Sequence, residues 1–240
     1  MKEIYLSRLW LNPRSRDVRR DMADCQQCHR TVLSAFPQLA NVEQKARAEF
    51  GILYRLDVDQ RRNMLTLLVQ SGVAPNWNNL PDDYLLSDTD GLNPSCKPVY
   101  EIFRTLQTGM RLQFRLRANP TRCVSQKAGG KRRGKRMGIY DESGQLDWLQ
   151  RQGAAHGFRL AAVSVSPSVA DLNAVPQAQA TGRRQTADGA KHATLTFGAV
   201  LFEGALIVID SALFQDALRN GIGRGKAYGF GLLSVARPQS

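Results

Sequence analysis

The segment Arg111-Leu112-Gln113-Phe114-Arg115-Leu116-Arg117-Ala118-Asn119-Pro120 decides the fold, because its side chains alternate between polar and apolar. An alternation of period two is typical of a β-strand with one buried face, so Leu112, Phe114 and Leu116 are expected to face a core. The arginines then share the opposite face. Asn119-Pro120 is a turn signal that ends the strand.

The segments on either side repeat the same order of elements. Before it, the sequence predicts a strand at 4–11, a helix from an N-cap at Ser15 to about Phe36, strands at 51–56 and 63–70, and loops at 72–98. After it come a loop at 131–136, a helix at 141–152, two strands around Asp188-Gly189, the second including 194–202, a helix at 210–220 and a strand at 232–235.

Two rounds of strand, helix and strands favour an α+β fold with two ferredoxin-like (RRM-like) domains in tandem. We expect an N-terminal domain over residues 1–95 and a C-terminal domain over residues 96–240. One larger α+β domain is the alternative, since the two halves share no tight sequence repeat.

Charge gives the first indication of function. The chain of 240 residues has 33 Lys and Arg against 21 Asp and Glu, a net charge of +12. Ten of the basic residues and no acidic residue lie between Arg111 and Arg136. A local field of this kind favours a polyanionic partner, which is a nucleic acid or an anionic membrane surface.

No apolar run is long enough to span a bilayer, and the first residues lack a signal-peptide core, so we expect a cytoplasmic protein without membrane contact. The four cysteines should then be reduced thiols. Cys25-Gln26-Gln27-Cys28-His29 matches the haem c attachment pattern, which leaves a redox protein as one alternative. We favour a structural reading in which Met22, Cys25 and His29 share a helical face, with no cofactor and no metal.

His29 can instead serve acid–base chemistry. RNA carries its own nucleophile, the 2′-hydroxyl, so a nuclease needs only to remove that proton and protonate the departing 5′-oxygen. A histidine can do one of these tasks near neutral pH. The glycine-rich segment Gly221–Gly231 is neither a P-loop nor a dinucleotide fingerprint, but its Arg224 and Lys226 could bind phosphate beside close backbone amides.

Three segments together resemble the CasE family, the pre-crRNA endoribonucleases of type I-E CRISPR systems. They are residues 114–120, the loop 221–231 with Leu232-Leu233-Ser234, and Ser15-Arg16-Asp17 leading to His29-Arg30-Thr31. The resemblance implies a metal-independent cut at the base of the CRISPR repeat stem-loop, with 2′,3′-cyclic phosphate and 5′-hydroxyl ends. It also implies that the enzyme retains its crRNA as part of Cascade, in contact with other Cascade subunits.

In that family the histidine at the His29 position is catalytic. Gln26 stands where members often have Tyr, and Ser34 where some have a basic residue, so these two positions are weaker catalytic candidates. An RNA-binding hairpin would carry Arg183 and Arg184 before its turn and Lys191 after it. Further RNA contacts are expected from Arg115, Arg117, Lys131, Arg132, Arg133, Arg224 and Lys226. A non-cleaving structural RNA-binding subunit is the alternative function.

Overall fold

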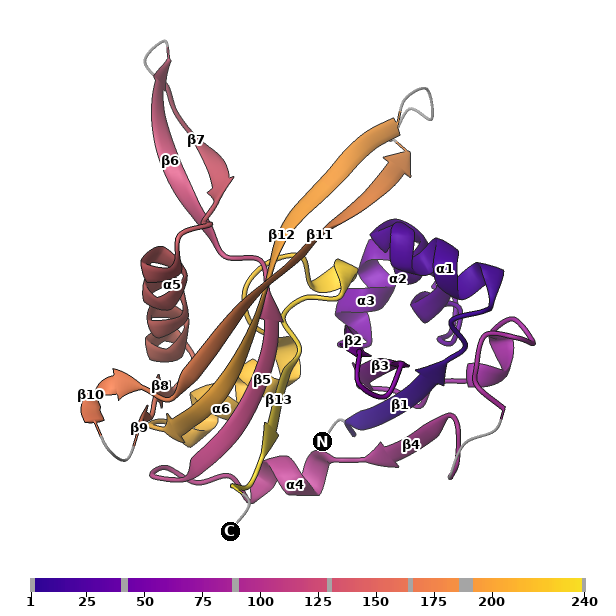
Figure 1. Cartoon of the computed structure of the whole chain (residues 1–240), viewed down its shortest axis with the longest axis horizontal. Helices are drawn as coiled ribbons and strands as arrows, with labels where there is room; N and C mark the ends of the chain where they lie inside the picture. The colour runs from indigo at the N-terminus through magenta and orange to yellow at the C-terminus, as the bar shows by residue number, and fades with distance from the viewer. Residues whose placement is uncertain are drawn as a thin grey trace.

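The computed structural model describes residues 3–39, 43–87, 91–128, 131–163, 166–185 and 192–238. Its main body has two antiparallel sheets, one built from the first hundred residues and one from the rest (Figure 1).

The first sheet has the strand order β2-β3-β1-β4. Its strands are β1 (Tyr5–Leu11), β2 (Leu53–Asp59), β3 (Met64–Ser71) and β4 (Ser95–Pro98). The helices α1 (Arg16–Ala23), α2 (Cys25–Leu33) and α3 (Glu43–Glu49) lie between β1 and β2, and the 3-10 turn η1 (Trp77–Asn79) follows β3. Leu9, Val32 and Leu67 are almost fully buried in the core that these elements share.

The second sheet repeats this order as β11-β12-β5-β13. Its strands are β5 (Arg111–Ala118), β11 (Leu172–Gln185), β12 (His192–Val208) and β13 (Leu233–Ala236), with β8 (Phe158–Leu160) paired to the end of β12. The helices α5 (Glu142–Ala155) and α6 (Ser211–Asn220) follow β5 and β12 in the chain. Both sheets therefore have the ferredoxin-like order, and the prediction of two such domains in tandem is confirmed.

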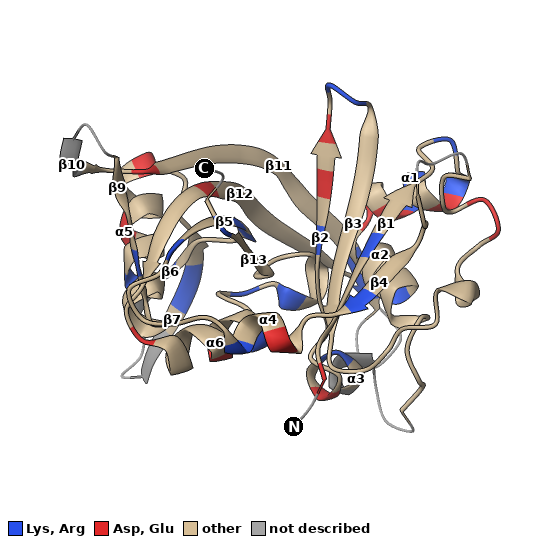
Figure 2. Cartoon of the chain, turned by 90° about the horizontal axis from the view of Figure 1, so that it is seen from below, with Lys and Arg blue, Asp and Glu red and all other residues tan. Residues whose placement is uncertain are grey.

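The pattern of buried and exposed residues in 111–118 is the one that their polar and apolar alternation predicts. Leu112, Phe114 and Leu116 are buried in the second core, while Arg111 and Arg115 are exposed. Figure 2 shows Lys and Arg positions on both halves of the chain, including β5. The division at residues 95 and 96 stays a prediction, and the first sheet itself continues to Pro98 because β4 pairs with β1.

A buried arginine joins the two sheets. Arg55 on β2 is 3% exposed and its guanidinium donates to the carbonyls of Arg115 and Leu232, at 3.2 and 3.3 Å. It also donates to the Ser234 hydroxyl at 2.9 Å and pairs with Asp57 at 2.8 Å. Because removing a partner of a buried charge is costly, this network fixes how the two domains meet.

The prediction of one helix from Ser15 to Phe36 is wrong. Ser15 does cap α1, but Asp24 has an extended backbone and its side chain caps a second helix, α2. Met22 consequently lies on α1, 46% exposed, and shares no helical face with Cys25 and His29. Local helical periodicity did not reveal the break, because a helix-favouring pattern continues on both sides of it.

The predicted loop at residues 131–136 is also wrong. These residues lie in β7 (Lys131–Gly138), which pairs with β6 (Thr121–Ala128) in a separate hairpin that projects from the body (Figure 1). A projecting two-stranded hairpin need not bury one face, so its sequence lacks the apolar alternation by which strands are recognised. The short helices α3 and α4 (Tyr100–Arg104) and the short strands β9 (Ala162–Val163) and β10 (Ser166–Ala170) were not predicted.

None of the described helices is long and apolar enough to cross a membrane.

Candidate functional site

Helix α2 presents two buried polar side chains, Gln26 and His29, one turn apart. The helix begins at Cys25 because the Asp24 carboxylate accepts hydrogen bonds from the backbone N–H groups of Gln26 and Gln27, at 2.8 and 3.3 Å. Such an N-cap satisfies amides that have no partner inside the helix. Residues three apart lie on one face, so both side chains point the same way, and each is 3% exposed.

His29 has the properties of a neutral imidazole. Burial lowers its pKa to about 4, and the positive charges of Arg47, Arg30 and Arg184 add to this effect. Within the described part of the chain, its buried Nδ1 atom has no hydrogen-bond partner. A buried polar atom without a partner costs about 1–3 kcal/mol, and such exceptions are candidates for a functional role.

The 3-10 turn η2 (Lys226–Tyr228) of the glycine-rich loop places a phenol beside this pair. The Tyr228 ring meets the His29 ring edge-on, with centroids 5.8 Å apart. Its hydroxyl donates to Gln26 Oε1 at 3.3 Å. Gly225 and Gly229 flank the turn with φ angles of 78° and 80°, in the left-handed region that favours glycine. The loop is therefore shaped to bring Tyr228 onto α2.

Arg117, predicted to bind RNA, helps to hold this loop. Its guanidinium lies 4.3 Å from the centroid of the Phe230 ring and donates to the Gly229 carbonyl at 3.3 Å and to Gln177 Oε1 at 2.9 Å. From the other domain, the Tyr54 hydroxyl donates to the Ala227 carbonyl at 2.8 Å. Arg117 is thus engaged within the protein, where burial lowers its pKa.

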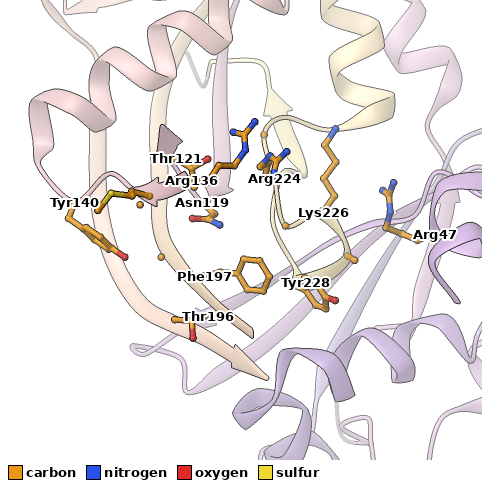
Figure 3. Close-up of a pocket in the computed structure, with 16 residues that line it drawn as sticks. Arg47, Asn119, Thr121, Arg136, Tyr140, Thr196, Phe197, Arg224, Lys226 and Tyr228 are labelled. Atoms are coloured by element: carbon orange, nitrogen blue, oxygen red, sulfur yellow. The ribbon is translucent and has the colours of Figure 1, made fainter. Parts of the chain in front are cut away.

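A basic cavity of about 610 Å³ opens beside Tyr228 (Figure 3). Its cationic lining comes from both domains: Arg47 on α3, Arg136 on β7, and Arg224 and Lys226 on the glycine-rich loop. None of its described lining residues is Asp or Glu. Burial and the charge of Arg47 lower the pKa of Lys226, which indicates that positive charge is concentrated here.

An adjoining cavity of about 530 Å³ shares Arg136, Arg224 and Lys226 with the first and adds Arg122 and Arg151. Its described lining also contains no acidic residue. The two cavities together form a basic surface between the β6–β7 hairpin and the glycine-rich loop. An anionic chain is the ligand that this surface favours.

The β11–β12 hairpin brings the predicted Arg183 and Arg184 near α2. Both side chains are exposed, in register with Thr194 and Ala193 on β12. The positive charge of Arg184 contributes to the lowered pKa of His29. The predicted Lys191 lies outside the described residues. For Lys131, Arg132 and Arg133 the structure gives the backbone, paired with β6, so their RNA-binding role stays a prediction.

Two predicted residues have local partners. Arg115 pairs with Glu203 at 2.5 Å and with Asp57 at 3.7 Å, so its charge is already compensated within the protein. Ser34 is exposed, and its hydroxyl donates to the Thr31 carbonyl at 2.8 Å. These contacts test neither the predicted RNA-binding role of Arg115 nor the predicted catalytic role of Ser34. Ser34 brings no positive charge to the site.

Sequence reasoning missed Arg47, Tyr228 and Asp24 as site residues. Asp24 carried a local signal, since an aspartate directly before a helix is a preferred N-cap. Arg47 and Tyr228 carried none, because both approach His29 only through the packing of distant segments. Cys25 and Cys28 are buried free thiols on α2, and burial raises the pKa of Cys25 to about 11.

The arrangement combines a neutral imidazole, a phenol and a basic cavity with no carboxylate in its described lining. Such a set can exchange protons with a bound polyanion and stabilise additional negative charge. Among the described residues, no group of three His, Cys, Asp or Glu side chains could hold a metal ion.

Comparison with known proteins gives relatives along the whole chain. The model of the family described as CRISPR associated protein matches residues 4–237. The CRISPR-associated endoribonuclease Cse3 of Thermus thermophilus is 35% identical over 97% of this chain and 100% of that protein. The Cascade subunit CasE of Escherichia coli K12 is 33% identical over 55% of this chain and 60% of its own length.

The fold gives the same relationship. A structure of Thermus thermophilus Cse3 bound to an RNA that represents a pre-cleavage complex has a TM-score of 0.72 to this chain, at 32% identity. The match covers 98% of this chain and 99% of that one. Because the family model matches residues 4–237 and the Thermus thermophilus protein is similar over nearly the whole of both chains, this chain belongs to the family of CRISPR associated proteins.

Proposed function

We propose that this protein is a metal-independent endoribonuclease that binds the CRISPR repeat hairpin and cuts pre-crRNA at the base of its stem. The observation that carries the proposal is His29, a buried neutral imidazole with an unpartnered nitrogen, next to the loop that lines a basic cavity. The full-length similarity to a protein named an endoribonuclease supports it independently.

The chemistry needs no water or metal to supply the nucleophile. The 2′-oxygen forms a bond to phosphorus, the bond from phosphorus to the 5′-oxygen breaks, and the products are a 2′,3′-cyclic phosphate and a 5′-hydroxyl. One proton leaves the 2′-hydroxyl and one is added to the 5′-oxygen. Because its pKa is low, His29 is neutral at pH 7, and its unpartnered Nδ1 is the atom that we assign to accept the first proton.

The phosphate becomes more negative along this path, and the site offers positive charge and hydrogen-bond donors. Arg47 is the cation with the largest electrostatic effect on His29. The Tyr228 hydroxyl is bound to Gln26 and can turn to a phosphate oxygen without leaving the site. Groups already oriented in this way stabilise a transition state at little reorganisation cost.

The RNA stem would be read by the β11–β12 hairpin through Arg183 and Arg184. Arginine binds guanine edges and phosphates bidentately, and both side chains are exposed on the strand that lies against α2. The basic cavities would hold the backbone that leaves the stem. We further propose that the protein acts in the cytoplasm and keeps its product as part of Cascade. The name of the Escherichia coli relative, a Cascade subunit, supports the membership in Cascade.

A second function is a structural RNA-binding subunit that does not cut. Two observations favour it: Gln26 and Ser34 cannot ionise as a phenol or a lysine would, and His29 is only 3% exposed. On this alternative, binding of the repeat is retained and no cleavage occurs.

Labelled repeat RNA incubated with the purified protein decides between the two. We expect wild-type protein to cut at one site, and His29→Ala to bind the hairpin with nearly unchanged affinity. Its cleavage should be slower by about 10²- to 10⁴-fold, the usual value of a positioned acid or base. Cleavage by His29→Ala at the wild-type rate would overturn the role of His29. If the wild-type protein binds the repeat and does not cut it, the second function, a structural RNA-binding subunit, is the correct one.

A further inference from the structure

The end of β11 is packed directly on the first turn of α2. Gly182 is buried there, and a Cβ atom at this position would lie 2.7 Å from Asp24 Oδ1, 2.9 Å from Cys25 Sγ and 3.0 Å from the Gln26 backbone nitrogen. A larger residue here would force these neighbouring atoms to shift, so the close approach depends on glycine. The hairpin that carries Arg183 and Arg184 is therefore in contact with the helix that carries His29.

Asp24 makes the polar part of this contact. One of its oxygens, Oδ1, accepts from the N–H groups of Gln26 and Gln27 and caps α2. The other, Oδ2, accepts from the backbone N–H of Arg183 at 3.2 Å. A single carboxylate thus holds the start of the helix with one oxygen and the hairpin with the other.

Capping alone does not require this second bond. Asp210 caps α6 through one oxygen, which accepts from Ala212 and Leu213 at 2.9 and 3.0 Å. Asp24 caps α2 with one oxygen in the same way. Among the described residues, however, no hairpin strand donates a hydrogen bond to the Asp210 carboxylate. The bond from Arg183 is therefore additional to what a helix start needs.

We propose that Asp24 is a positioning residue that docks the β11–β12 hairpin onto α2 and so sets the distance between the bound stem and His29. The inference rests on the proposed function, because it assigns stem binding to the hairpin and proton transfer to His29. Asp24 lies only five positions before His29, at the start of the same helix, and bonds to Arg183. A stem held by Arg183 and Arg184 is then placed relative to His29 through this short connection. Errors of about 1 Å in such placement can cost 10²-fold in rate.

Loss of the Asp24 bond should affect the rate far more than the affinity. The hairpin keeps its arginines when this bond is removed, so the stem still binds, but the scissile phosphate no longer arrives in register with His29. The effect should appear in the single-turnover rate at saturating RNA. The dissociation constant should change much less.

Asp24→Ser is the first variant. Serine is a good N-cap, but its one hydroxyl is too short to hold the hairpin as well. Asp210→Ser is the matched control, because it makes the same change at a helix start outside the site. Gly182→Ala is the second variant. It breaks the same contact from the hairpin side and leaves the Asp24 carboxylate in place.

Repeat RNA in excess protein gives the cleavage rate, filter binding gives the affinity, and thermal unfolding compares the two serine variants. We expect Asp24→Ser and Gly182→Ala each to cut about 10- to 100-fold more slowly, with affinity within about threefold of wild type. The double variant should be no slower than the worse single variant, because both changes remove one contact. Asp210→Ser should cut at the wild-type rate.

Cleavage by Asp24→Ser within twofold of Asp210→Ser would overturn the proposal, as would equal losses of rate and affinity. If Asp24→Ser does not fold, Gly182→Ala decides by the same two criteria. Failure of the proposed function is a different result, since wild-type protein itself would then leave the repeat uncut.

Discussion

His29 should make the protein less stable in mild acid, and the size of the effect follows from its burial. An unfolded histidine titrates near pH 6.5, whereas in the folded protein burial and the charges of Arg47, Arg30 and Arg184 lower the pKa of His29 to about 4. Between these values the unfolded chain binds a proton that the folded chain does not. Stability is therefore lost as the pH falls below 6.5, by about 1.4 kcal/mol for each pH unit.

Over the interval from pH 7 to pH 5 this contribution is about 2 kcal/mol. His29→Gln removes it, because the glutamine amide does not titrate. Urea unfolding at both pH values, followed by tryptophan fluorescence, gives the free energy of unfolding for each protein. We expect wild type to lose about 2 kcal/mol more than His29→Gln between pH 7 and pH 5.

His156→Gln is the control. Burial also lowers the pKa of His156, but that side chain is only half-buried, so we expect an effect of the same sign and smaller size. Equal losses in wild type and His29→Gln would refute the reasoning, since His29 would then be no harder to protonate in the folded protein than in the unfolded chain.

Two further predictions concern RNA. The double variant Arg183→Ala, Arg184→Ala should abolish discrimination between cognate and scrambled stems. Neutralising Lys131–Arg133 should weaken the binding of all RNAs alike, and should reduce the slope of log affinity against log salt concentration by roughly 0.7 for each phosphate that is no longer bound. Equal losses of affinity for both RNAs in both variants would exclude reading of the stem by the β11–β12 hairpin. Tyr228→Phe keeps the ring against His29 and removes the hydroxyl, so a fall of about tenfold in cleavage, absent from a Tyr5→Phe control, would indicate that the hydroxyl itself acts.

Much of the fold was predictable because it follows local periods. The alternation from Arg111 to Ala118 predicted β5, its buried face and the sheet around it. The turn signal at Asn119-Pro120 marked the end of that strand. Where local pattern and structure differed, the cause was one capping carboxylate at the break before Cys25, and the projection of the β6–β7 hairpin from the main body.

The site was predictable only in part. His29 and the glycine-rich loop stood out by residue type, and family resemblance joined them. Tyr228 comes 199 residues after His29 and reaches it through packing between the two domains. Arg47 comes 18 residues after His29 and acts on it through packing of α3 beside α2 within the first domain. No period or spacing encodes such contacts. The second bond of Asp24, to Arg183, is likewise a product of tertiary structure.

The most direct test of the proposed mechanism uses one atom of the substrate. Repeat RNA with a single 2′-deoxy substitution at the scissile nucleotide is compared with all-ribose RNA, both in EDTA, and the product ends are analysed. We expect the all-ribose RNA to be cut to a 2′,3′-cyclic phosphate and a 5′-hydroxyl, and the deoxy RNA to be bound and stay intact. Cleavage of the deoxy RNA, or a strict requirement for Mg²⁺, would contradict this mechanism.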